Sequence, residues 1–219
     1  ARYQTEVFSF ATSCTSSAQA IGYAYKMLKS GMYEKALVIG FEMFNRLTFE
    51  HFQAMNLLSQ EAQYSPLTNP TGIVLGEGIG CVALSTQPNP QLPCEIVGVT
   101  TLTDNENLTN SSESALRNLI NACLNNANFM PADIDGVKVH GVGGNSDEME
   151  LRVLQEIFPH AQWLSIKTQT GHTLGASGAL ESAILFNQLK SELQKCGRFL
   201  NYFLGFGGSN IAWVLEVNK

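Results

Sequence analysis

Residues 10–22 read FATSCTSSAQAIG and place one cysteine, Cys14, between small hydroxyl side chains. The preceding residues 6–11 alternate and are rich in β-formers, which predicts a short strand running into Cys14. Residues 16–30 carry apolar side chains at helical spacing, and Gly31 stands at the C-cap position. A cysteine at such a turn is either a nucleophile or a small buried side chain, and this segment alone leaves both interpretations open.

The composition limits the classes of function. The chain has 219 residues, 44% hydrophobic and 15% charged, which is typical of an ordinary globular protein of one large or two small domains. A net charge of −6 argues against bulk electrostatic binding to nucleic acid, and no apolar run reaches the ~18 residues of a membrane span. The 5 cysteines are odd in number and form no CxxC pair, so we expect a cytoplasmic protein without disulfides or zinc.

The remainder of the chain alternates between strand and helix patterns, which predicts an α/β fold with mostly parallel sheets covered by helices. The polar, proline-bearing connector TQPNPQLP divides it into two halves, residues 1–90 and 91–219. Further strands are expected at residues 36–40, 80–84, 96–101, 137–140, 163–167, 200–204 and 211–217, and helices at 47–58, 112–126, 147–158 and 176–193.

Three segments of the second half carry chemistry-bearing side chains: VKVHGVGGNSDEMEL, SIKTQTGHTLGASGALE and NYFLGFGGSN. His140 and Lys167 end predicted strands, His172 precedes a helix, and the GFGG turn joins two strands. Ligand sites of α/β sheets lie at the carboxyl ends of strands. A helix N-terminus favours the thiolate of Cys14, imidazoles move protons, and glycine turns present N–H groups to an oxyanion. Together these groups predict acyl transfer through a thioester.

These segments, in this order, resemble the β-ketoacyl synthase (ketosynthase) family of the thiolase superfamily. SCTSSAQAIG resembles its nucleophile segment, and LGEGIG resembles the strand after its active-site loop. VHG and GHTLGASG resemble the segments of its two catalytic histidines, and SIKT that of its lysine. GFGGSN resembles its gating turn, and the D-x-x-E of residues 147–150 its site-organising acids. The resemblance implies a thiolase-like layered fold.

The resemblance also implies a role for each matching residue. Cys14 would accept an acyl group from an acyl carrier protein, and His140 and His172 would support decarboxylation of a malonyl group and the condensation that follows. Lys167 would polarise the site. The oxyanion hole and gate would be formed by Phe206 and Gly207 together with the amide of Cys14. Asp147 and Glu150 would be supporting acids. No metal or organic cofactor is implied.

Several interpretations stay open beside these roles. Phe206 fits a gate and a core residue equally well, Lys167 could be a solvated strand end, and Asp147 and Glu150 could be ordinary acids of a helix N-terminus. The segment before the nucleophile strand is shorter than in the family, so the chain resembles the later part of a synthase. A related ketosynthase subunit, in a homo- or heterodimer, is therefore an expected partner.

The length also leaves two functions open. The first is an acyltransferase of the 3-oxoacyl synthase type in fatty acid or polyketide synthesis, active alone or within a heteromer. The second is a non-catalytic, chain-length-factor-like subunit that stabilises a full-length ketosynthase, although such subunits typically lack the reactive cysteine. A thiolase is a third possibility, from which GHTLGASG and VHG differ more.

Overall fold

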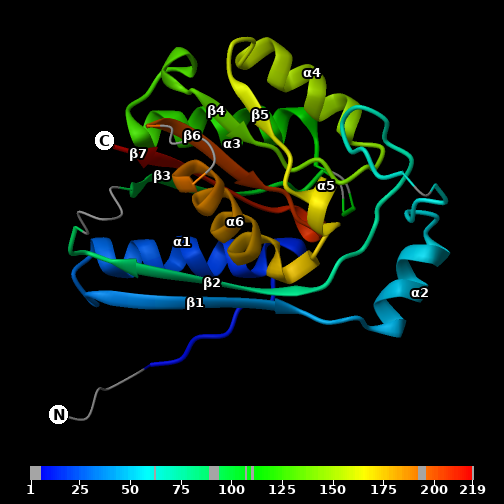
Figure 1. Ribbon diagram of the computed structural model, residues 1–219, viewed down its shortest axis with the longest axis horizontal. Coiled ribbons are helices and arrows are strands. Elements are labelled where there is room, and N and C mark those ends of the chain that lie inside the picture. The colour runs from blue at the N-terminus through cyan, green and yellow to red at the C-terminus, as the bar shows by residue number, and fades with distance from the viewer. Residues whose placement is uncertain are drawn as a thin grey trace.

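The structure, a computed structural model, describes residues 6–61, 63–88, 94–106, 108–109, 111–191 and 196–218. Its described elements lie in four layers (Figure 1). A two-stranded sheet, β1 (Lys35–Glu42) and β2 (Gly78–Ser85), forms the first layer. Helices α1 (Ser16–Lys29) and α6 (Ser177–Ser191) form the second. A five-stranded sheet is the third, and α3 (Glu113–Ala127) and α4 (Asp147–Ile157) cover its far face.

The five-stranded sheet has the order β3-β7-β6-β4-β5. Its strands are β3 (Cys94–Thr103), β4 (Gly136–Lys138), β5 (Gln162–Leu164), β6 (Gly197–Phe203) and β7 (Ser209–Val217). The expectation of mostly parallel pairing is wrong for the described strands. Only β4 pairs in parallel, with β5 and β6, whereas β1–β2, β3–β7 and β6–β7 are antiparallel. The tight turn between β6 and β7 permits only an antiparallel pair.

The expected strand at residues 6–11 is also absent, because these residues have no strand hydrogen bonds in the structure. A strand needs a neighbour, and no described strand pairs with this segment. Phe8 and Phe10 instead pack against Tyr23 of α1, with ring centroids 5.2 and 5.3 Å apart. The prediction of a strand at residues 6–11 is therefore wrong.

Most other elements lie where the sequence pattern predicts them. Two elements near the site end earlier than predicted. Helix α2 (Arg46–Ala54) ends before residue 58, and strand β5 ends at Leu164. Lys167 therefore does not end a strand but begins the short helix α5 (Lys167–Thr170). Part of the predicted connector, residues 89–93, and the end of the helix predicted at 176–193 fall outside the described residues.

The core holds the layers together on both faces of the five-stranded sheet. Leu119 and Leu154, from α3 and α4, are fully buried against Val137 on one face. Ile21 of α1 packs near Trp213 on the other face. Burying each such side chain stabilises the fold by roughly 1.5–3 kcal/mol. This packing fixes the loops at one end of the sheet.

The two middle helices approach each other closely at Gly178. A Cβ atom at this position would lie 2.0 Å from the backbone N of Ala18, a distance that no side chain tolerates. Because α1 follows Cys14 directly and α6 follows His172, this close contact brings the two segments together.

Candidate active site

Cys14 lies in a single 3₁₀ turn, Ser13–Thr15, that leads into α1. Ser13 has a φ of +53°, a left-handed conformation that residues other than glycine rarely adopt. The turn is held by the Thr12 N–H, which donates to the Ser16 hydroxyl at 2.9 Å. It directs the Cys14 side chain inward, where it is only 4% exposed. Such a strained turn beside a helix is typical of a functional position.

The backbone amides of Phe206 and of Cys14 itself act on the sulfur and lower its pKa. The amides favour the thiolate as expected, but burial opposes ionisation more strongly. Burial raises the pKa of Cys14 to about 11, and the Phe206 amide and the charge of Lys167 reverse only part of this effect. Cys14 is therefore a thiol at neutral pH, and it loses its proton only when it reacts.

His140 and His172 come from two different loops and meet edge to face. Their ring centroids are 5.8 Å apart, with an interplanar angle of 83°. His140 follows β4, and His172 is placed by backbone hydrogen bonds with Val74 and Gly76, at 2.7 and 3.0 Å. Both imidazoles are buried.

Both histidines are neutral at physiological pH. Desolvation, followed by the charge of Lys167, holds the pKa of His140 well below its usual value and lowers that of His172 to about 3. The Leu204 N–H donates to Nδ1 of His140 at 3.5 Å, so the proton of His140 resides on Nε2. His140 therefore presents an N–H donor from its free edge.

Lys167 is buried rather than solvated, with 1% of its surface exposed. Its Nζ lies 2.7 Å from Oε1 of Glu181 on α6, as an ion contact whose angles fall outside those of a hydrogen bond. Its charge acts on Cys14, His140 and His172 alike. The three predicted reactive side chains therefore all feel the charge of one ammonium group.

Asp147 and Glu150 hold the loop that carries His140. Oε1 of Glu150 accepts the N–H of His140 at 2.7 Å, and both of its oxygens accept that of Gly141. The hydroxyl of Tyr202 donates to the same carboxylate. These acids are not ordinary caps of a helix N-terminus, because buried carboxylates bind the backbone of another segment.

Asp147 clamps a second strip of backbone beside this loop. Its Oδ2 accepts the N–H groups of Leu67 and Gly143 at 2.7 and 2.9 Å, and Oδ1 accepts that of Val142 at 3.1 Å. Burial raises the pKa of Asp147, and the hydrogen bonds from these amides counteract that rise. The D-x-x-E pattern thus joins α4, the histidine loop and the segment around Leu67.

The GFGG turn carries Phe206, whose amide acts on Cys14. Phe206 is half-buried and stacks on Phe52 of α2, with ring centroids 5.7 Å apart and planes inclined by 10°. Gly207 has a φ of +79°, and its N–H donates to the carbonyl of Leu108 at 2.7 Å. Of the Phe206 and Gly207 amides, that of Phe206 is the one that acts on Cys14.

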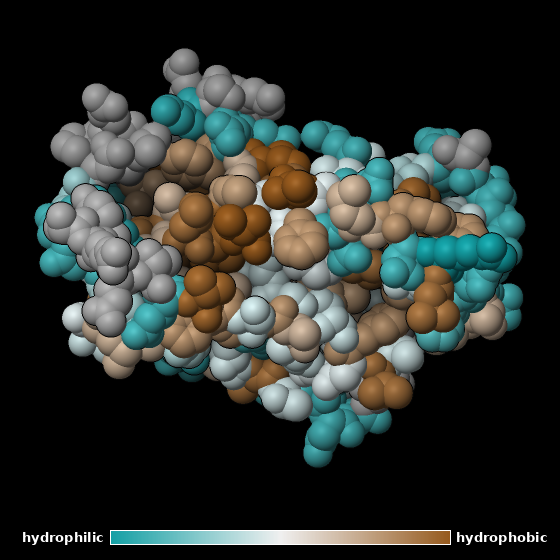
Figure 2. Space-filling view, turned by 90° about the horizontal axis from the view of Figure 1, so that it is seen from below, coloured by the Kyte–Doolittle hydropathy of each residue, from teal (hydrophilic) through white to brown (hydrophobic). Residues whose placement is uncertain are grey.

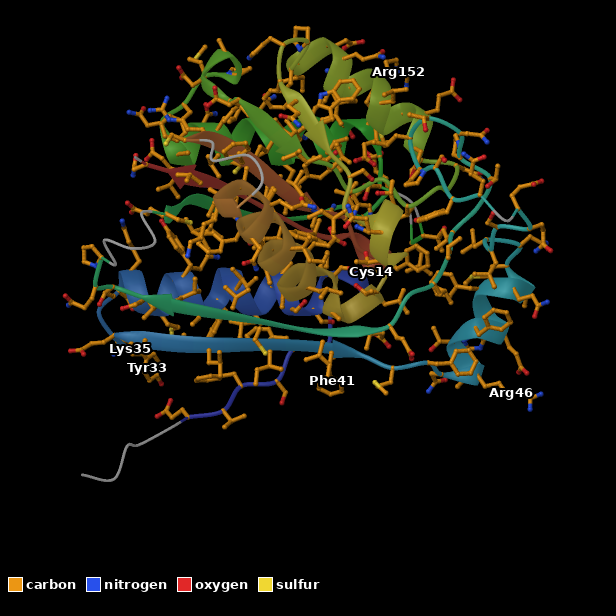
Figure 3. All side chains as sticks on the ribbon, in the orientation of Figure 1. Cys14, Tyr33, Lys35, Phe41, Arg46 and Arg152 are labelled. Carbon is orange, nitrogen blue, oxygen red and sulfur yellow. The ribbon has the colours of Figure 1, made fainter. Side chains whose placement is uncertain are left out.

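The structure thus brings the predicted site residues together in the interior of the molecule, where Figure 3 places Cys14. Sequence reasoning missed three contributors: Lys138, Glu181 and Tyr202. Two of them carry a visible signal, since Lys138 interrupts the apolar strand VKV and Glu181 interrupts the small, apolar stretch GASGALESAILF. Within the described residues no group of three or more His, Cys, Asp or Glu could hold a metal ion.

Comparison with protein families gives two matches. Residues 4–89 match the family described as beta-ketoacyl synthase, N-terminal domain, and residues 93–194 match beta-ketoacyl synthase, C-terminal domain. A 3-oxoacyl-acyl-carrier-protein synthase 2 of Coxiella burnetii is 29% identical over 195 residues, covering 80% of this chain and 47% of that protein. Nodulation protein E of Rhizobium sp. is 28% identical, covering 80% and 46%. The chain spans about half the length of these relatives.

Solved structures give the same fold. A ketosynthase in complex with its chain length factor, from Xenorhabdus doucetiae, has a TM-score of 0.86 at 26% identity, over 96% of this chain and 60% of that one. A beta-ketoacyl synthase from Burkholderia phymatum also has a TM-score of 0.86, at 22% identity, over 95% and 61%. The expected thiolase-like layered α/β fold is confirmed. No helix in the part of the chain that the structure describes is long and apolar enough to cross a membrane.

Proposed function

The chain belongs to the β-ketoacyl synthase family, and on this premise we propose that it catalyses the decarboxylative condensation of an acyl thioester with malonyl-acyl-carrier protein. The observation that carries this proposal is the arrangement around Cys14. The amides of Phe206 and Cys14 and the Lys167 ammonium all favour negative charge on its sulfur, and the same ammonium acts on His140 and His172. A nucleophile, an oxyanion hole and neutral imidazole donors are the groups that such a reaction needs.

The first half-reaction transfers the acyl group to Cys14. The sulfur attacks the thioester carbonyl of an acyl chain on an acyl carrier protein, and the amides of Cys14 and Phe206 hold the oxyanion. The carbon–sulfur bond to the carrier breaks, and the carrier's thiol leaves with the proton that Cys14 gives up. The raised pKa of Cys14 fits this sequence, because a thiol that is protonated at rest is protected from side reactions.

The second half-reaction uses the histidines. A malonyl thioester loses carbon dioxide, and the electron pair of the broken carbon–carbon bond forms an enolate whose oxygen accepts N–H donors from His140 and His172. The enolate carbon attacks the carbonyl carbon of the Cys14 thioester, the bond from that carbon to the sulfur breaks, and the Cys14 thiolate takes a proton from solvent. Lys167 stabilises the negative charge without forming a bond. No step requires a metal or an organic cofactor.

The second candidate is a non-catalytic subunit, of the chain-length-factor kind, that completes a ketosynthase partner. One observation favours it: the outward face of β1 and β2 exposes an apolar surface, which lies across the middle of the view in Figure 2. Leu37, Ile39, Phe41 and Ile79 are each more than half exposed there, at 64, 55, 68 and 62%. Monomeric proteins rarely expose such patches, so we infer a related ketosynthase subunit as the partner.

We further propose that residues 1–90 and 91–219 act as two thiolase-like halves, the first supplying the nucleophile and the second the histidines. A cytoplasmic location is part of the same proposal. It is supported by the cysteines, all 5 of which are free thiols.

Intact mass spectrometry tests the proposed reaction. The chain, alone and together with any protein that copurifies, is incubated with an acyl-loaded carrier protein, and Cys14→Ala serves as the control. An acyl adduct that depends on Cys14 supports the synthase. A folded chain that gains no adduct with its partner present contradicts the synthase and supports the non-catalytic subunit.

A further inference from the structure

Lys138 is a buried cation on β4 of the five-stranded sheet. It ends β4, between β5 and β6, with buried valines on either side in the sequence, and none of its surface is exposed. Its Nζ donates to Oε2 of Glu181 at 2.8 Å and to the carbonyl of Tyr202 at 3.0 Å. It also lies 3.5 Å from the ring centroid of Phe203. Lysine is seldom fully buried unless it is paired.

The pairing of Lys138 is shared. Glu181, itself fully buried, places Oε2 at 2.8 Å from Lys138 and Oε1 at 2.7 Å from Lys167. One carboxylate therefore faces two ammonium groups. A buried charge is costly unless it is compensated, so a fold optimised for stability alone would pair these charges one to one or place an apolar residue at position 138.

We propose that Lys138 is a positioning residue of this site: it shares the single carboxylate of Glu181 with Lys167, and the positive charge that this sharing leaves in the cluster adds to burial in keeping His140 and His172 neutral. The catalytic consequence rests on the proposed condensation, whereas the charge itself does not.

The electrostatics of the neighbourhood agree with this geometry. Lys138 and Lys167 both lower the pKa values of the two histidines, after desolvation, which is the larger cause. Desolvation lowers the pKa of Lys138 itself to about 8 against the attraction of Glu181. The titratable or charged groups around Lys138 are Glu181 on α6, Lys167 on α5, Glu150 on α4, and His140 and His172 in the adjoining loops.

Burial of Lys138 beside a carboxylate that it shares with Lys167 has a measurable signature in unfolding. Because the pKa of Lys138 is lower in the folded than in the unfolded chain, the folded state gives up this proton first. Stability therefore rises as the pH increases from about 8 to about 10.5. Urea unfolding at pH 7.5 and 10 should show the folding constant of the wild type rising roughly tenfold or more relative to K138M. K35M, which removes an exposed lysine at the far end of β1 (Figure 3), should follow the wild type.

K138Q separates charge from hydrogen bonding, since glutamine can still donate to the Tyr202 carbonyl but is neutral. It should lose the alkaline rise as K138M does, and it serves if K138M fails to fold. If the difference in unfolding free energy between the wild type and these variants is the same at pH 10 as at pH 7.5, the charge of Lys138 is fully compensated. That result would overturn the proposal.

A second measurement connects the charge to the histidines. In chains with labelled histidine, NMR should show His140 and His172 neutral at pH 6 and above, with the exposed His51 and His160 as internal references. Lowering the pH should protonate His172 about threefold more readily in K138M or K138Q than in the wild type. Equal titration in all three chains would contradict the positioning role. If the chain is an active synthase, the same variants should lower kcat and leave KM unchanged. If the chain gains no acyl adduct, the pH dependence of unfolding and the histidine titration still test the role of Lys138.

Discussion

The thiol of Cys14 lies in surroundings that oppose its ionisation more than they favour it. Two amides and the Lys167 ammonium act on the sulfur, yet burial outweighs them and raises its pKa to about 11. A helix N-terminus contributes typically 0.3–1 kcal/mol to a charge near it, whereas complete burial of a charged group shifts a pKa by several units. Desolvation therefore decides the state of this residue.

Alkylation of Cys14 should consequently accelerate with pH throughout the range from 7 to 10, by about tenfold per pH unit, because the thiolate fraction grows without reaching a plateau. Lys167→Met should slow the reaction several-fold at a given pH, since the removed cation favours the thiolate. Iodoacetamide labelling with peptide mass spectrometry gives the rate at Cys14, and the exposed Cys196 reports general access of the reagent. A plateau below pH 9 would mean that Cys14 is not desolvated as the structure has it.

At the scale of elements, α4 acts as a clamp on the histidine loop. Glu150 accepts the N–H groups of His140 and Gly141, and burial raises its pKa to about 7. The folded chain therefore binds a proton at Glu150 where the unfolded chain, with an ordinary pKa near 4.5, has lost it. The contribution of Glu150 to stability is largest below pH 4.5 and falls as the pH rises through 7.

Glu150→Gln should remove this pH dependence. The difference in unfolding free energy between the wild type and the variant should shrink by up to about 3 kcal/mol between pH 5 and pH 7.5, with the wild type losing the advantage. Urea unfolding at the two pH values measures it, and the exposed Glu148→Gln on the same helix is the control. If the difference in unfolding free energy instead grows with pH, the hydrogen bonds from the loop amides outweigh desolvation in setting the pKa of Glu150.

The contact between α1 and α6 gives a second prediction at this scale. Gly178→Ala should destabilise the fold by about 1–3 kcal/mol, because the added Cβ would meet the backbone of Ala18 at 2.0 Å and must push the helices apart. Gly175→Ala is the matched control, since its Cβ would meet nothing nearer than 3.4 Å. Thermal unfolding of both variants measures the difference. Equal stabilities would mean that the two helices separate without cost.

Much of this element order was predictable from hydrophobic spacing, and the site from short motifs around Cys14, His140 and His172. The failures have physical causes. Residues 6–11 read as a strand, but strand formation depends on a neighbour that spacing does not reveal. Lys167 read as a strand end, although tertiary contact with Glu181 places it in a helical turn.

The contacts that complete the site lie beyond local pattern altogether. Lys138 and Glu181 are 43 positions apart and meet only because β4 packs beneath α6. The same holds for Asp147 and Leu67, which are 80 positions apart. A charge inside an apolar strand or helix signals that a partner exists, but the sequence does not identify the partner.

At the scale of the whole molecule, the layers are covered unequally. Helices α3 and α4 cover one face of the large sheet, and the outward face of β1 and β2 has no described layer over it (Figure 1). Phe41 projects from β1 away from the middle helices (Figure 3). A two-stranded sheet is marginal by itself; α1 and α6 support its inner face, and we propose that an associating subunit covers its outer one.

Phe41→Glu should therefore weaken association of this chain, with itself or with a copurifying subunit, by roughly tenfold or more, because a carboxylate would have to be desolvated in the interface. Met130→Glu is the matched control, since Met130 is equally exposed, at 68%, but lies after α3, outside the outward face of β1 and β2. Sedimentation velocity over a range of concentrations gives the association constant, and circular dichroism verifies that both variants fold. If Phe41→Glu and the wild type associate equally, or if the wild type stays monomeric with no bound partner at high concentration, the apolar face of β1 and β2 is not an interface. If only Phe41→Glu dissociates, the outward face of β1 and β2, opposite α1 and α6, is where the chain joins its subunit.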